Sequence, residues 1–148
     1  MLTAFHKMHG LGNDFVILDE RPAPLPLTPA CVAALAHRRR GIGCDQLVTL
    51  ATPTLPGADV LVRFFNPDGS EAGACGNASR CVAVLLHRQQ GLATPVRQTR
   101  AGLLPATVDT ARGLVTVGMG PPPLGWGAGP RASGRDRLGR PPPGAPAA

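Results

Sequence analysis

The stretch that decides the fold is residues 60–90, VLVRFFNPDGSEAGACGNASRCVAVLLHRQQ. Residues 60–65 are mostly β-branched or aromatic, which is typical of a strand. Residues 66–70 then carry the Asn-Pro-Asp-Gly chemistry of a tight turn. Beyond the turn, apolar residues recur at helical spacing up to a glycine at position 91, so we expect a helix from about Gly76 to Gln90. Three apolar residues give this helix a face for the core: Val82, Leu85 and Leu86.

Outward from this stretch, the chain reads as strands with one further helix. Thr28 followed by Pro29 is typical of a helix N-terminus, and we expect this helix to run to about Arg39. The basic run 38–40 before Gly41 is interpreted as a last helical turn suited to the helix dipole. Further strands are expected at 15–19, 45–50, 95–100, 103–108 and 113–119, the last three as an antiparallel meander. The sequence therefore predicts an α+β unit in which a curved, mixed or antiparallel sheet surrounds a central helix.

Composition divides the 148 residues into a body and a tail. Residues 121–148 hold 8 of the 17 prolines and 6 of the 19 glycines, together with half of the net charge of +6. We therefore expect one domain over 1–120 and a disordered Gly/Pro/Arg-rich tail over 121–148. The body has no basic stripe beyond 38–40, which argues against nucleic acid as a partner. No apolar run approaches the roughly 18 residues of a membrane span and no signal peptide is seen, so we expect a cytoplasmic protein without membrane contact.

The four cysteines, Cys31, Cys44, Cys75 and Cys81, form no Cys-x-x-Cys pair. A zinc site or a redox dithiol is therefore not expected, and no metal is predicted. Such thiols in a reducing compartment are ordinarily small buried apolar side chains, which is our expectation for three of them. Cys75 is the exception because of its surroundings.

Cys75 directly precedes Gly-Asn at the expected start of the core helix. There the thiol lies beside unpaired backbone N–H groups and the positive end of the helix dipole. Such a position favours a thiolate and binds anions, and a carboxylate is the ligand we expect there. Gly76 would let the backbone approach a ligand, and Asn77 would add its own N–H or its side-chain amide.

Two more glycine-rich loops carry polar side chains, HGLGND at 9–14 and GIGCDQ at 41–46. The first lacks the spacing of a dinucleotide or phosphate loop, so a hairpin turn is its plain structural interpretation. Asn13 and Gln46 in these loops, with Asn66 in the turn, suggest an uncharged hydrogen-bonding rim for a zwitterion.

Three motifs together resemble the N-terminal half of the diaminopimelate epimerase family over about residues 4–120. They are KMHGLGNDFVILD at 7–19, HRRRGIGCDQLV at 37–48 and RFFNPDGSEAGACGNASRCVA at 63–83. The resemblance implies a cofactor-independent isomerase that interconverts LL- and meso-diaminopimelate in lysine and peptidoglycan precursor synthesis. It also implies a fold of two similar α/β lobes, each a curved sheet around a helix, with the site between them.

The resemblance also implies roles for individual residues. Cys75 matches the first of two catalytic cysteines that exchange the α-proton on opposite faces of the substrate. The implied substrate-binding residues are three amides and the carboxylate-binding turn: Asn13, Gln46, Asn66, Gly76 and Asn77.

The chain also departs from the family. Family members are nearly twice as long, and their second lobe carries the other cysteine. The family pattern is lost after 119–124, where the tail looks like a shifted reading frame, so we expect a truncated product that is weakly active or inactive alone. Whether a homodimer or a second lobe supplied in trans would complete it stays open. Two alternatives also stay open: a non-catalytic remnant that binds carboxylates, and a proline-type amino-acid racemase.

Overall fold

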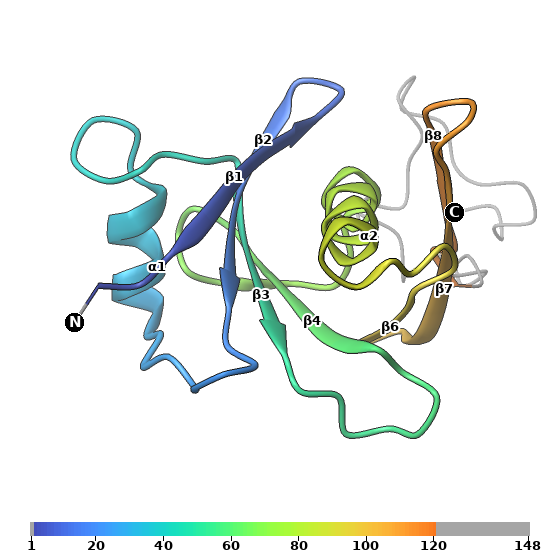
Figure 1. Cartoon of the computed structure of the whole chain (residues 1–148). Coiled ribbons are helices and arrows are strands. Elements are labelled where there is room, and N and C mark those ends of the chain that lie inside the picture. Colours follow the sequence, from blue (N-terminus) through green and yellow to red (C-terminus); the bar gives the residue numbers. More distant parts are fainter. Residues whose placement is uncertain (1, 121–148) are drawn as a thin grey trace, which may run out of the picture.

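The computed structural model describes residues 2–120, and the tail expected at 121–148 lies outside them. Within that range the chain forms one eight-stranded mixed sheet with two helices (Figure 1). The strands are β1 (Phe5–Gly10), β2 (Asn13–Asp19), β3 (Gln46–Ala51), β4 (Val60–Phe65), β5 (Glu71–Ala72), β6 (Val96–Thr99), β7 (Gly102–Asp109) and β8 (Leu114–Val117). The helices are α1 (Pro29–Ala36) and α2 (Gly76–Gln90). The α+β expectation is confirmed.

The sheet combines local hairpins with two parallel pairings. Its strand order is β1-β2-β3-β4-β6-β7-β8, with β5 paired to β4 at one side. β1 and β2 form a hairpin whose turn residues, Leu11 and Gly12, both have positive φ, so the hairpin interpretation of 9–14 is correct. β2 runs parallel to β3 and β4 runs parallel to β6, while the other pairings are antiparallel. The expected meander appears as β6, β7 and β8.

Helix α2 lies in the hollow of the curved sheet, as Figure 1 shows. It contacts β1 on one side and β7 and β8 on the other, so both ends of the strand order close around it. Its buried face packs against alternate residues of the central strands, including Phe15, Ile17, Val48 and Phe64. Val82 and Leu86 are fully buried in this cluster and Leu85 is nearly so, which confirms the predicted core helix.

Helix α1 covers the opposite face of the sheet. Val32 and Ala36 pack there against Val16, Leu47 and Phe65, which alternate with the residues facing α2. The predicted N-terminus is confirmed, because Oγ1 of Thr28 accepts a hydrogen bond from the backbone N–H of the third residue after it at 3.2 Å.

The predicted end of α1 near Arg39 is wrong. The helix ends at Ala36, and no basic side chain lies in its last turn. The following loop folds back onto it: the N–H groups of Ile42 and Gly43 both donate to the carbonyl of Leu35, and that of Cys44 donates to Ala36. These backbone donors satisfy the carbonyl groups at the end of the helix, and the basic run 38–40 lies in the loop after it.

The cysteines divide as expected with one exception. Cys44 and Cys81 are buried in the two core clusters, which confirms their structural interpretation. Cys31 is exposed on α1, so the expectation that it is buried is wrong. No helix within the described range 2–120 is long and apolar enough to cross a membrane.

Candidate functional site

Sheet register gathers the predicted site residues at one end of three strands. Asn13 is the first residue of β2, Gln46 is the first of β3, and Asn66 directly follows β4. Because β2 and β3 are parallel and β4 is antiparallel to β3, the two strand starts and the one strand end coincide. The start of α2 lies at the same place, since Nδ2 of Asn77 donates to Oδ1 of Asn13 at 2.8 Å.

Cys75 is the N-cap of α2. Its Sγ accepts from the backbone N–H of Ala78 at 3.5 Å, and its half-buried side chain packs against the core. The N–H groups of Gly76 and Asn77 in the first helical turn make no hydrogen bond to any residue within 2–120. The structure therefore puts a thiol at the positive end of a 15-residue helix, beside backbone donors that are unused within residues 2–120.

The other cysteines are poorly suited to proton transfer at this end. Burial raises the pKa of the thiols of Cys44 and Cys81. Cys31 lies across the sheet on α1, where a hydrogen bond with Thr28 lowers its pKa. Of the four cysteines, all within residues 2–120, Cys75 alone is half-buried and directly precedes Gly76 and Asn77.

The amides meet in two pairs. Asn13 and Asn77 form the first, and Nη1 of Arg80 donates to Oδ1 of Asn77 at 2.6 Å. Gln46 and Asn66 form the second, with Nε2 of Gln46 donating to Oδ1 of Asn66 at 3.3 Å. The structure therefore brings the amides together as two pairs, and no hydrogen bond joins one pair to the other within the described residues.

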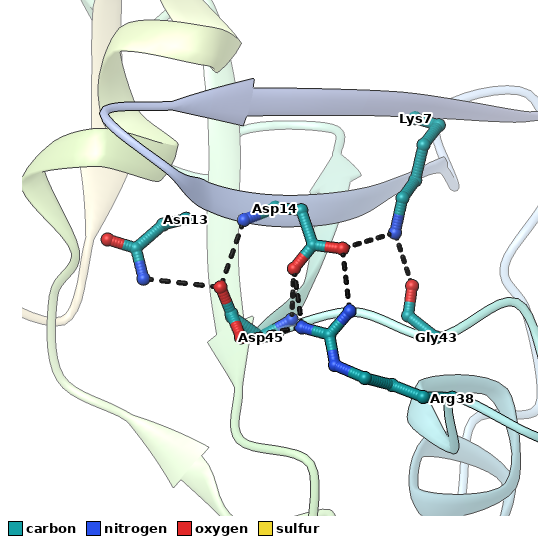
Figure 2. Close-up of polar contacts among 6 residues, drawn as sticks. All are labelled: Lys7, Asn13, Asp14, Arg38, Gly43 and Asp45. Atoms are coloured by element: carbon teal, nitrogen blue, oxygen red, sulfur yellow. Dashed lines mark hydrogen bonds and ion pairs between the residues drawn. The ribbon is translucent and has the colours of Figure 1, made fainter.

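An ion-pair network lies beside Asn13, one member of the first amide pair (Figure 2). Arg38 donates to Oδ1 of Asp14 and to Oδ1 of Asp45, each at 2.7 Å. Lys7 pairs with Asp14 at 2.8 Å and also donates to the carbonyl of Gly43. The interpretation of Arg38 as part of a last helical turn is thus wrong, because its side chain bridges two carboxylates.

The network links three segments of the chain. The backbone N–H of Asp45 donates to Oδ1 of Asp14 at 3.0 Å, and that of Asp14 donates to Oδ2 of Asp45 at 3.1 Å. Hydrogen bonds from Arg38, with support from Lys7, hold the pKa of the Asp14 carboxyl well below its usual range. Asn13 joins the network through Nδ2, which lies 3.4 Å from Oδ2 of Asp45.

Sequence reasoning missed this network and the contact of Arg80. One signal was available: an aspartate precedes the buried run of both β2 and β3, at positions 14 and 45. Two parallel strands with that pattern place their carboxylates side by side, and a shared cation is then expected. The pattern becomes informative only when the parallel pairing is known.

Several solved structures share this fold, two isomerases among them. A hydroxyproline epimerase from Agrobacterium vitis superposes with a TM-score of 0.63 at 18% identity, covering 79% of this chain and 41% of the other. A methylitaconate-delta-isomerase gives a TM-score of 0.61 at 21% identity, covering 78% and 62%. At these identities the likeness establishes the fold alone.

Sequence relatives identify the family. The family model described as diaminopimelate epimerase matches residues 5–124. The diaminopimelate epimerases of Rhodospirillum centenum and Gluconobacter oxydans are 53% and 56% identical over 138 residues, 93% of this chain. Matches of that length include part of residues 121–148. The chain spans about half the length of these curated relatives, 47% and 51%. It belongs to the diaminopimelate epimerase family.

Proposed function

We propose that this chain takes part in the epimerisation of LL- and meso-diaminopimelate, with Cys75 as one acid/base group. The observation that carries the proposal is the position of Cys75: it caps α2 beside the N–H groups of Gly76 and Asn77, which no residue within 2–120 accepts, and Asn77 belongs to one of the two amide pairs at this end of the sheet. The relatives at 53% and 56% identity are named for this reaction.

The helix N-terminus addresses the main chemical difficulty. The α-proton of an amino acid is weakly acidic, because the carbanion left behind needs stabilisation. Its charge spreads onto the α-carboxylate. In our proposal that carboxylate binds to the N–H groups of Gly76 and Asn77, where fixed dipoles stabilise the growing negative charge without reorganising.

The thiol of Cys75 would then act on one face of the α-carbon. A thiolate removes the proton, and the resulting thiol can return one to the same face. Inversion needs a second group on the opposite face. Cys44 and Cys81 do not suit that role, since both are buried and burial raises their pKa. We propose that the second group is not among residues 2–120 of this chain. It would come from the rest of the chain, from a second copy or from a further lobe.

The remaining amides would hold the rest of the substrate. Diaminopimelate carries a carboxylate and an ammonium group at each end, so it needs both donors and acceptors. Asn13, Gln46 and Asn66 offer both without a net charge. We propose these three as substrate-binding residues. Because binding and proton transfer are both assigned to protein groups, the proposal includes neither a cofactor nor a metal.

The test is exchange of the α-hydrogen of LL-diaminopimelate in deuterated water, read by mass spectrometry and chiral chromatography. We expect deuterium uptake by the chain, a loss of at least about 100-fold in Cys75→Ala, and no loss in Cys31→Ala, which removes an exposed thiol across the sheet. Uptake with inversion would mean that a second acid is present, and uptake without inversion that one base works alone. Both results support the role of Cys75.

Proline and hydroxyproline serve as competing substrates in the same assay. Exchange of these amino acids in place of diaminopimelate would overturn the proposed substrate and favour a proline-type racemase. Binding of LL-diaminopimelate with no exchange in any form of the chain would overturn the catalytic role and leave a carboxylate-binding module.

A further inference from the structure

We propose that Asp45 and Asp68 are positioning residues that fix the orientation of the four site amides through two hydrogen-bond relays. As a result, the site offers N–H donors to a carboxylate. The inference rests on the proposed function only where it assigns the ligand. The orientation itself follows from which groups can donate and which can only accept.

The first relay runs from Asn77 through Asn13 to Asp45. Nδ2 of Asn77 donates to Oδ1 of Asn13 at 2.8 Å, and Nδ2 of Asn13 lies 3.4 Å from Oδ2 of Asp45. An ionised carboxylate can only accept, so the NH2 end of Asn13 must face it. The opposite end is fixed as well, because the guanidinium of Arg80 can only donate and lies 2.6 Å from Oδ1 of Asn77.

The second relay runs from Gln46 through Asn66 and Ser70 to Asp68. The hydroxyl of Ser70 donates its one proton to Oδ1 of Asp68 at 2.6 Å. Its oxygen therefore accepts from Nδ2 of Asn66 at 3.1 Å. This leaves Oδ1 of Asn66 to accept from Nε2 of Gln46 at 3.3 Å. The same bond from Ser70 lowers the pKa of Asp68, which keeps the end of the relay ionised.

Reversing an amide in either relay breaks it. A flipped Asn13 would turn its carbonyl oxygen toward the carboxylate of Asp45 and its NH2 group toward the NH2 group of Asn77. A flipped Asn66 would likewise turn its NH2 group toward that of Gln46. Each arrangement exchanges a hydrogen bond for a repulsive contact between like dipoles.

The fixed orientation decides which ligand group the site favours. Each NH2 group carries two hydrogens and donates one of them within its relay. Each of the four amides therefore retains one N–H that no described residue accepts. These donors add to the backbone N–H groups of Gly76 and Asn77. The combined set is therefore directed at the carboxylate groups of the ligand, and the lone pairs left on the amide oxygens can accept from its ammonium groups.

The test separates orientation from activity by observing side-chain amides directly. In Asp68→Asn the relay loses its acceptor-only end while the turn keeps a residue of the same shape. We expect the ¹⁵N–¹H signals of the Asn66 and Gln46 side chains to shift in the free protein. Asp109→Asn is the matched control: Asp109 also accepts a backbone N–H in a turn, but contacts no site amide within the described residues.

A second pair of variants at Ser70 checks the result independently of Asp68. Ser70→Ala removes the hydroxyl and should shift the same two amide signals. Ser70→Thr keeps the hydroxyl and should restore them. In the exchange assay, Asp68→Asn should raise the half-saturating concentration of LL-diaminopimelate by roughly 2- to 10-fold, the equivalent of one net hydrogen bond, with little change in the maximal rate.

Unchanged Asn66 and Gln46 signals in Asp68→Asn and in Ser70→Ala would overturn the second relay. Shifts of equal size in Asp109→Asn or in Ser70→Thr would also overturn it, because they would show a general structural effect. Relay-dependent signals in a chain that exchanges no α-hydrogen would keep the relay and overturn the proposed function instead.

Discussion

Replacing Gly69 with alanine should destabilise the protein, because the added methyl group would push the site turn, residues 66–70, away from α1. Gly69 is buried, has φ of +88°, and sits in the turn between Asn66 and Ser70. A Cβ at this position would lie 2.3 Å from the carbonyl oxygen of Pro29 and 2.7 Å from its carbonyl carbon. Both are backbone atoms at the start of α1, so no side-chain rotation relieves the overlap.

Gly57→Ala provides the matched control. Its φ of +83° is similar, but an added Cβ there meets no atom within 4 Å. The left-handed backbone alone should cost Gly57→Ala about 1–2 kcal/mol. Gly69→Ala bears the same cost together with that of overpacking, which gives roughly 2–5 kcal/mol. For a domain of this size these values lower Tm by about 4–8 °C and roughly 8–20 °C respectively.

The assay is urea unfolding of both variants beside the parent chain, with thermal melting as a second measure. The difference between the two variants isolates the contact with Pro29. Equal destabilisation of Gly69→Ala and Gly57→Ala would refute the packing of the site turn against α1. In Gly69→Ala we also expect the Asn66 side-chain amide signal to move, because this residue begins the displaced turn.

Two further predictions concern the core and the ion-pair network. Leu86→Ala, in the face of α2 toward the sheet, should lower the free energy of unfolding by about 2–5 kcal/mol. Leu114→Ala, at a site 59% exposed, should change it by under about 0.5 kcal/mol. Equal effects of the two variants in urea unfolding would contradict the central place of α2. Arg38 and Lys7 hold the pKa of Asp14 low in the folded state, so its stabilising contribution is present above the unfolded pKa near 4 and is lost as the pH falls further. Asp14→Asn should therefore flatten the fall in unfolding free energy between about pH 4 and more acidic pH, and parallel profiles would contradict this.

The parts of the fold predicted well from the sequence are those set by local patterns. The strand at 60–65, the turn after it and the helix 76–90 each carry their own periodicity or turn chemistry, and each lies where it was expected. The parallel pairings of β2 with β3 and of β4 with β6 were not predicted, because they join segments through long connections. The end of α1 was misplaced for the same reason, since donors in the returning loop stop the helix.

The site divides in a similar way. Cys75, Gly76 and Asn77 are readable from the sequence because one local feature, the start of a helix, groups them. From the sequence, the amides at 13, 46 and 66 could be predicted only as members of separate polar loops. The sheet register places them at the same end of the sheet. Arg38, which bridges Asp14 and Asp45, looked like part of a last helical turn, and its role depends on contacts across the fold. Asp68, which we propose to orient Asn66 through Ser70, looked like ordinary turn chemistry.

The most direct test of the central claim is deuterium incorporation at the α-carbon of LL-diaminopimelate by three forms of the chain: the parent, Cys75→Ala and Cys31→Ala. The proposal predicts incorporation by the parent and by Cys31→Ala, and a rate at least about 100-fold lower for Cys75→Ala. Equal incorporation by the parent and Cys75→Ala, or its absence from the parent, would contradict the assignment of Cys75 as an acid/base thiol.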